Sequence, residues 1–186
     1  DLLGFLDADG TCDPNFFAPL CKILAEKKAD ISLGCRMNTK SKMPVVRRIG
    51  NAVYAGLLSM FSSTNVRDTA SGMRVVCQSS LKKLMPLPDG LHFTPAMSAR
   101  AILSRDLKIV EIDMPYEERA GESKLHIWKD GLRFLRVIFE SAVLYCPERI
   151  LGLLGFLTFI FASAMMLMPS IFYFHHGRLE EWMIYR

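Results

Sequence analysis

Two aspartates, Asp7 and Asp9, directly follow the first apolar run of the chain, residues 2–6. An apolar run of this length is typical of a fully buried strand in a parallel sheet, so both carboxylates are expected at the carboxyl end of a strand. Open α/β sheets bind their ligands at that edge, and carboxylate oxygens suit Mg2+ or Mn2+, which would in turn bind a diphosphate. The pair alone is weak evidence, because Asp is also common in turns.

Two later polar loops contain charged side chains that could act on the same ligand. Asp68 lies in a loop of residues 64–72 and, taken alone, is interpreted as a turn residue. Arg119, Ser123 and Lys124 lie around a glycine just ahead of a predicted helix. These three side chains could bind a phosphate group, or they could belong to a solvated loop in which Ser123 caps the helix.

The first part of the chain alternates between predicted strands and helices that would position such loops. Asp13 followed by Pro14 predicts a helix start, and the apolar positions after it predict a helix to about Lys28. This helix lies between predicted strands at residues 2–6 and 31–35, and strand, helix, strand is the unit of an α/β sheet. The other expected elements are helices at residues 45–61, 80–85 and 94–104 and strands at residues 73–77 and 107–114.

A membrane-spanning helix is predicted near the C-terminus. Residues 150–174 contain no charged side chain and exceed the roughly 20 residues that cross a bilayer core, with a buried core helix as the alternative. Residues 125–145 ahead of them form a basic amphipathic pattern that suits the membrane surface. Lys129, Arg133 and Arg149 contribute to an excess of Lys and Arg before the span, so this side is expected to face the cytoplasm.

Charge and cysteine usage weigh against other classes of protein. The formal net charge is +4, and no basic run with interleaved aromatic residues supports binding to nucleic acid. The five cysteines are scattered without a Cys-x-x-Cys pair. This spacing argues against a zinc site or a disulfide framework and favours reduced thiols in a cytoplasmic domain.

An ordered set of motifs gives the sequence its family resemblance. The set consists of Asp7-Ala8-Asp9, Gly34-Cys35-Arg36, Arg47-Arg48, Asp68 to Arg74, and Arg119 to Lys124. In this order the motifs resemble the family-two glycosyltransferases of the polyprenyl-phosphate type, which include the dolichyl-phosphate mannosyltransferases. The resemblance covers residues 1–125, and the membrane span after them is also similar. It implies an α/β fold, namely part of a Rossmann-like A-type nucleotide-diphosphosugar transferase domain. The family's usual N-terminal stretch, with its nucleotide-base pocket, does not occur here, so an N-terminal truncation is expected.

The resemblance also implies roles for individual residues. Asp7 and Asp9 match the pair that binds metal and nucleotide, and Asp68 matches an aspartate near the reacting centre. The positions that match phosphate-binding residues of the family are Arg36, one of Arg47 and Arg48, Arg119, Ser123 and Lys124. Thr11 stands where many relatives have Gln, which puts a metal ligand at that position in doubt.

The implied activity is metal-dependent, inverting transfer of a hexose from a nucleotide-diphosphosugar to dolichyl or undecaprenyl phosphate. The expected organisation is a glycosyltransferase domain at residues 1–124, a juxtamembrane helix at 125–149, a membrane span at 150–174, and a loop at 175–186 that could begin a second span. The catalytic domain would face the cytoplasm, at the inner membrane of a bacterium or the endoplasmic reticulum of a eukaryote. Membrane lipids are expected partners, and a homo-oligomer is left open.

Two alternatives remain open from the sequence. The first is a membrane transferase of the same fold that glycosylates a hydroxyl group on a lipid or polysaccharide. Such enzymes usually carry a Gln-x-x-Arg-Trp signature, and none occurs here. The second is a non-catalytic membrane scaffold, against which the number of charged loop residues argues.

Overall fold

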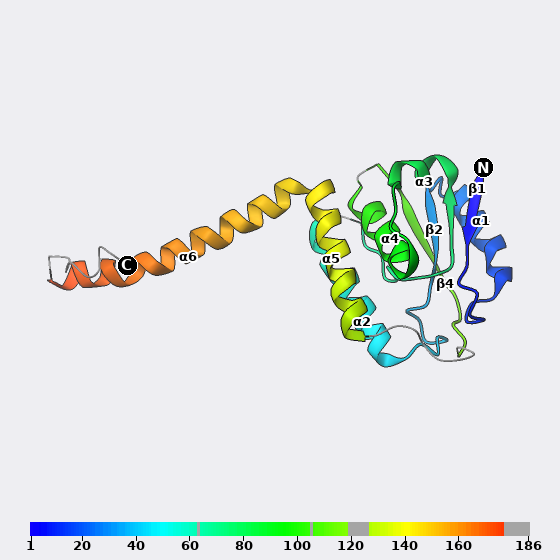
Figure 1. Ribbon diagram of the computed structural model, residues 1–186, viewed down its shortest axis with the longest axis horizontal. Helices are drawn as coiled ribbons and strands as arrows, with labels where there is room; N and C mark the ends of the chain where they lie inside the picture. Colours follow the sequence, from blue (N-terminus) through cyan, green and yellow to red (C-terminus); the bar gives the residue numbers. More distant parts are fainter. Residues whose placement is uncertain (63, 105, 119–126, 177–186) are drawn as a thin grey trace. The chain divides into compact units, whose positions relative to one another are not determined.

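The structure is a computed structural model that describes residues 1–62, 64–104, 106–118 and 127–176 (Figure 1). Contacts within the chain divide it into two compact units, Asp1–Cys146 and Pro147–Arg186. The first unit contains a sheet with helices on both sides, and the described part of the second is a single helix.

A mixed four-stranded sheet forms the centre of the first unit. Its strands are β1 (Leu2–Phe5), β2 (Ile31–Cys35), β3 (Arg74–Cys77) and β4 (Ile109–Asp113), in the order β1-β3-β2-β4. β2 and β4 are parallel, with Ile31 opposite Ile109, and β3 is antiparallel to both of its neighbours. β1, β2 and β4 therefore run in the same direction. Their carboxyl ends meet at one edge of the sheet, where β3 begins.

The expectation that the first strand is a fully buried member of a parallel sheet is wrong. Among the described strands, β1 pairs only with β3, in antiparallel register, and lies at the edge of the sheet. Leu2 is 46% exposed and Leu3 36% exposed, whereas every residue of β2 is buried. A short apolar run predicts a strand, but it does not reveal whether other elements cover both of its faces.

Helices cover both faces of this sheet. The helical elements of the first unit are η1 (Pro14–Phe16), α1 (Phe17–Glu26), α2 (Val45–Phe61), α3 (Gln78–Leu84), η2 (Gly90–His92), α4 (Phe93–Leu103) and α5 (Ile127–Tyr145). Figure 1 shows α1 on one side of the sheet and α4 on the other. The predicted start of the first helix is confirmed: the Asp13 side chain accepts a hydrogen bond from the backbone N–H of Asn15 at 2.9 Å, and Pro14 is the first helical residue.

α5 packs against α2 and α4 and still leaves apolar side chains in solvent. The Tyr54 hydroxyl of α2 donates to the carbonyl of Gly131 at 2.9 Å, and the Tyr54 ring meets that of Phe134 edge-on. Ile138 is buried in this packing, but Phe139 is 61% exposed. Further apolar residues of α5 that lie outside are Leu132, Leu135, Val143 and Leu144.

The described part of the second unit is α6 (Pro147–His176). From Pro147 to His175 it is long and apolar enough to cross a membrane, and no other helix in the described part of the chain meets that standard. It contains the whole stretch of residues 150–174 that the sequence predicts as a membrane span.

Candidate active site

The predicted site residues that the structure describes gather in loops at the edge where β1, β2 and β4 end. Asp7 and Asp9 follow β1, Arg36 follows β2, and the loop with Asp68 leads into β3. Residues 114–118, which continue into the segment containing Arg119, follow β4. Ligands of open α/β sheets bind at this edge, so the topology places the candidate residues where a site is expected.

Asp68 and Arg36 form a buried, two-pronged ion pair. Arg36 Nε donates to Asp68 Oδ2 at 2.7 Å and Nη2 donates to Oδ1 at 2.9 Å, while the Arg36 backbone N–H also donates to Oδ2 at 2.9 Å. The side chain of Asp68 is fully buried and that of Arg36 is 11% exposed. Burial opposes the charge on Arg36, yet the neighbouring carboxylate raises the pKa of this guanidinium above its ordinary value. The guanidinium therefore stays charged, and the Tyr116 ring, whose centre is 5.4 Å from the guanidinium carbon, packs against it.

The loop around Asp68 is fixed from two sides. On one side, Asn51 of α2 donates from Nδ2 to the carbonyl of Arg67 at 2.8 Å, and its Oδ1 accepts from the Thr69 hydroxyl at 2.9 Å and from the Ala70 N–H at 3.2 Å. On the other side, the Glu111 carboxylate of β4 accepts from the backbone N–H of Asp68 at 2.9 Å. Asn51 is only 4% exposed, so its hydrogen bonds are shielded from water.

The same loop lies directly against the first aspartate of the Asp-Ala-Asp motif. A Cβ atom added to Gly72 would lie 1.9 Å from Asp7 Oδ2. Only a glycine allows the loop backbone to come this close to the Asp7 carboxylate. The first and second predicted motifs are therefore packed together through Gly72.

The second aspartate of the motif connects to the third predicted loop. Asp9 Oδ1 accepts from the Thr11 hydroxyl at 2.6 Å and from the Thr11 backbone N–H at 3.2 Å. The Thr11 carbonyl in turn accepts from the backbone N–H of Glu117 at 2.9 Å. Thr11 is thus a partner of Asp9, and it joins the Asp-Ala-Asp turn to the strand end that leads toward Arg119.

A buried arginine, Arg74, also holds the loop that contains Asp68. Its guanidinium donates to the carbonyl of Ser71, to the carbonyl of Thr94 at 3.3 Å and to the hydroxyl of Ser98 at 3.2 Å. It is 1% exposed, and burial lowers its pKa to about 10 even though Asp68 and Asp7 favour the charge. The arginine ties the Asp68–Gly72 loop to α4.

The chemistry of the Asp7 and Asp9 side chains fits a divalent cation. Both are carboxylates in one turn, and hard oxygen ligands of this kind suit Mg2+ or Mn2+, which usually retains several waters and binds substrate phosphates as well. Among the described residues, no group of three or more His, Cys, Asp or Glu side chains could form a metal site by itself. A cation here would take two protein ligands and complete its coordination with ligand oxygens and water.

Other predicted phosphate-binding residues are less directly connected to this centre. Arg47 and Arg48 lie in the first turn of α2, at the end of the loop that begins with Arg36. Arg48 Nη2 donates to the carbonyl of Asn38 at 3.3 Å. Arg119, Ser123 and Lys124 lie outside the described residues.

Asn51 and Glu111 are site residues that sequence reasoning did not single out. Each has a feature in the sequence that could have identified it. Asn51 is a polar residue at a core position of an otherwise amphipathic helix, and Glu111 is an acidic residue within a largely apolar strand. Buried polar groups require hydrogen-bond partners, and a backbone loop is one source of them.

Comparison with known proteins gives two relatives from Haloferax volcanii. The low-salt glycan biosynthesis hexosyltransferase Agl6 is 28% identical over 169 residues, which cover 87% of this chain and 41% of Agl6. A dolichyl-phosphate hexose transferase is 32% identical over 153 residues, which cover 79% of this chain and 62% of that protein. No protein-family model matches the chain. The chain thus spans from about two fifths to about three fifths of the length of these relatives.

Solved structures support the fold. Glucosyl-3-phosphoglycerate synthase from Mycobacterium tuberculosis, crystallised with Mn2+, UDP-glucose and glycerol 3-phosphate, matches with a TM-score of 0.52 at 15% identity. The same enzyme in complex with phosphoglyceric acid gives a TM-score of 0.53 at 14% identity. Each match covers 79% of this chain and 50% of the enzyme. At this identity the likeness shows the fold alone, and it confirms the expected α/β fold of the A-type nucleotide-diphosphosugar transferases.

Proposed function

We propose that the chain belongs to an inverting hexosyltransferase. Its predicted resemblance to the family-two glycosyltransferases of the polyprenyl-phosphate type is confirmed by its two relatives from Haloferax volcanii. The donor would be a nucleotide-diphosphosugar, and the acceptor would be a polyprenyl phosphate such as dolichyl or undecaprenyl phosphate. One relative is named for a dolichyl-phosphate acceptor, which favours a phosphate over a hydroxyl group.

The observation that carries this proposal is the convergence of three motifs far apart in the sequence. Asp7 lies against Gly72, and Thr11, the partner of Asp9, accepts a hydrogen bond from Glu117. Carboxylates, a buried Arg–Asp pair and the start of the segment that contains Arg119 are thereby brought to one edge of the sheet. This combination suits a ligand that carries a diphosphate and a metal ion.

The proposed reaction needs alignment and charge neutralisation more than proton transfer. A lipid phosphate is already an anion at neutral pH, so it can attack the anomeric carbon without a strong general base. Direct in-line displacement would invert that centre and release the nucleoside diphosphate. A cation at Asp7 and Asp9, Mn2+ or Mg2+, would neutralise charge on the leaving diphosphate. The mycobacterial enzyme of the same fold was crystallised with Mn2+ and UDP-glucose, which supports this choice of cofactor.

Asp68 would act by positioning rather than as a base. Its carboxylate is fully buried and accepts three hydrogen bonds from Arg36. That arrangement holds the guanidinium still at the carboxyl end of β2, where its charge can favour a phosphate. Arg47 or Arg48, Arg119, Ser123 and Lys124 would supply further contacts to donor or acceptor phosphates.

Exposed apolar surface supports a location at the membrane. Val46, Ile49 and Val53 lie outward on α2, and Leu132 and Phe139 do so on α5, all more than half exposed. Large apolar side chains in solvent mark a surface that contacts something else. With α6 as the span, α5 would lie at the headgroup level as a juxtamembrane helix, and the glycosyltransferase domain would face the cytoplasm.

The direct test is a transfer assay on the full-length protein in detergent. The protein is incubated with Mn2+, a panel of radiolabelled nucleotide sugars and either dolichyl or undecaprenyl phosphate, and label is extracted into organic solvent. We expect metal-dependent transfer from one donor, lost in Asp9→Ala. Label that reaches a lipid hydroxyl, or no transfer from any donor by a folded protein, would contradict the proposed acceptor or the proposed activity.

A further inference from the structure

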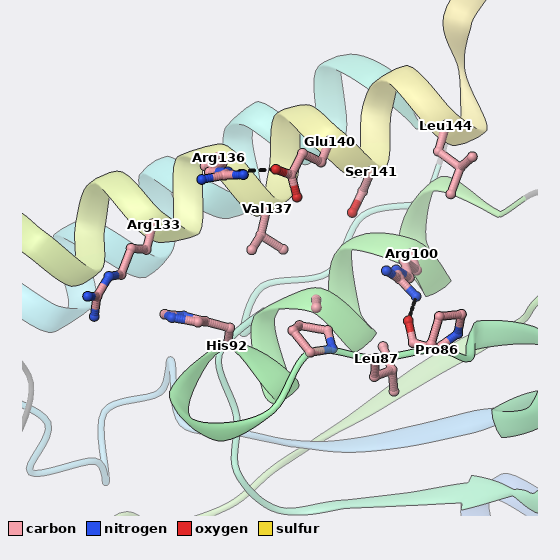
Figure 2. Close-up of a pocket in the computed structure, with 12 residues that line it drawn as sticks. Pro86, Leu87, His92, Arg100, Arg133, Arg136, Val137, Glu140, Ser141 and Leu144 are labelled. Carbon is pink, nitrogen blue, oxygen red and sulfur yellow. Dashed lines mark hydrogen bonds and ion pairs between the residues drawn. The ribbon is translucent and has the colours of Figure 1, made fainter.

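A cavity lies away from the candidate active site. It encloses about 600 Å³ between the loop at residues 86–88, α4 and α5 (Figure 2). This volume is typical of sites for small ligands. Its lining contains neither Asp7 nor Asp68, so the catalytic centre proposed above does not account for it.

The lining is basic on one side. Arg100 of α4 and Arg133 and Arg136 of α5 all border the cavity, and Glu140 is the one carboxylate among the described residues that line it. Glu140 accepts from Arg136 Nε at 2.6 Å, and Asp130, beside the cavity on the same helix, accepts from Arg133 Nη1 at 3.2 Å. Arg100 is therefore the one lining arginine for which the described residues give no carboxylate partner. Arg100 donates from Nη1 to the carbonyls of Leu84 and Pro86. Its guanidinium is therefore anchored at the Nη1 end only.

The rest of the lining is apolar, apart from Ser141 and a histidine that has one ring nitrogen without a hydrogen-bond partner. Leu87, Ala96, Val137 and Leu144 line the cavity together with Pro86 and Pro88. His92 lines it as well, and its Nδ1 is buried without a hydrogen-bond partner. A buried polar atom without a partner is uncommon in native structures. A bound ligand with an oxygen atom near His92 would supply the missing partner.

The cavity lies close along the chain to the proposed membrane span. Leu144 precedes Pro147, the first residue of α6, by only three residues. Residues this near the start of a span lie at the level of the lipid headgroups, where acidic phospholipids are the most abundant anions.

From these observations we propose that the cavity binds a phosphate group carried by an apolar chain, namely the headgroup of an acidic phospholipid of the bilayer. This inference rests on the membrane location proposed above but not on the transfer reaction. Arg133, Arg136 and the unanchored end of Arg100 would contact the phosphate, since guanidinium groups bind phosphate oxygens in pairs. Val137, Leu144 and the proline loop would contact the first part of the acyl chains.

The test counts lipids bound to the full chain in detergent by native mass spectrometry. The probes are dioctanoyl-phosphatidylglycerol, dioctanoylglycerol without the phosphate, and inorganic phosphate. We expect saturable binding of the phosphatidylglycerol, none of the dioctanoylglycerol, and much weaker binding of inorganic phosphate. Equal affinity for inorganic phosphate would overturn the lipid as the source of the phosphate group.

Matched variants localise the binding. Arg133→Gln with Arg136→Gln removes two charges from side chains that are 58% and 79% exposed. Because Arg133 also pairs with the buried Asp130 at 3.2 Å, thermal unfolding checks that this variant is folded. Lys22→Gln with Lys82→Gln removes the same charge from α1 and α3, and Lys22 is half of an i,i+4 pair with Glu26 as Arg136 is with Glu140. We expect affinity for phosphatidylglycerol to fall at least about tenfold in the arginine variant only, which is about 1.4 kcal/mol.

A third variant and an independent readout separate the outcomes. Leu144→Glu places a carboxylate in the lining at a 68% exposed position and should weaken binding in the same way. Equal affinity in the arginine and lysine variants would refute the site. Because none of the changed residues lies near Asp7 or Asp68, metal-dependent binding of the sugar donor should stay unchanged. If the wild-type protein does not bind the sugar donor, that result would instead count against the proposed function.

Discussion

At Gly72, any side chain would occupy space that the Asp7 carboxylate fills, since an added Cβ would lie 1.9 Å from Oδ2. We expect Gly72→Ala to displace Asp7 and to lower transfer about a hundredfold, because displacements near 1 Å have effects of that size. Gly56→Ala is the matched control: nothing lies within 4 Å of its added Cβ, and alanine should stabilise α2 by about 1 kcal/mol. Initial rates and thermal unfolding of both variants check this, and an active Gly72→Ala protein would contradict the close packing.

Asp68 offers a separate test, because its charge holds Arg36. Asp68→Asn leaves a buried guanidinium without its counter-charge, so we expect the free energy of unfolding to fall by about 3–5 kcal/mol. Asp113→Asn breaks the half-exposed pair with Arg67, which has a similar distance of 2.6 Å, and should cost less than about 1 kcal/mol. Denaturant titration distinguishes these values. Near-normal turnover in Asp68→Asn would argue against any role of Asp68 in the reaction.

Cys35 provides a prediction about pH. Burial raises the pKa of its thiol to about 11, so only about one thiol in a thousand is ionised at pH 8. Because the folded-state pKa is above the unfolded one, this thiol contributes stability below pH 9 that is lost as the pH rises toward 11. Mass-spectrometric mapping of alkylation at pH 8 should find Cys35 unmodified in the folded protein and modified after unfolding. Rapid labelling of the folded protein at Cys35 would show that this thiol is accessible to solvent and would contradict the prediction.

At the scale of elements, α2 connects an exposed apolar face to the loop that contains Asp68. Asn51 makes that connection by donating to the Arg67 carbonyl and accepting from Thr69 and Ala70. We expect Asn51→Leu to lower kcat by at least about tenfold, because it leaves three buried backbone or hydroxyl groups unpaired, at roughly 1–3 kcal/mol each. Ser59→Ala on the same helix removes only a bond to Ala55 and should be silent. Equal activity of the two variants would show that α2 does not position the loop.

The elements also show what sequence patterns can and cannot predict. Residues 31–35 and 45–61 are a strand and a helix with the predicted bounds, because each has a clear apolar pattern. The edge position of β1 could not be predicted, since it depends on pairing with β3, some seventy residues away. The same limit applies to the site. The ordered set of motifs and the family resemblance indicate Asp7, Asp9 and Asp68, but Asn51 and Glu111 act through hydrogen bonds to backbone that no local pattern reveals.

For the molecule as a whole, the proposed function requires α6 to be inserted in a bilayer. The protein should stay with the membrane fraction after alkaline carbonate extraction. Leu157→Arg should reduce insertion, because an arginine at the centre of a span costs about 2.5–3.5 kcal/mol. Leu157→Phe is the control and should behave as the wild type. Release of the wild-type protein by carbonate would contradict the membrane span.

We infer that loops from three parts of the sequence form one site for a metal ion and a nucleotide-diphosphosugar. Calorimetric titration of the full-length protein with nucleotide sugar, with and without Mn2+, measures that binding. We expect binding that requires the metal, with an affinity that falls at least about tenfold in Asp7→Asn and Asp9→Asn and is unchanged in Asp89→Ala, whose side chain makes no capping bond. Metal-independent binding, or equal affinity in all three variants, would contradict it.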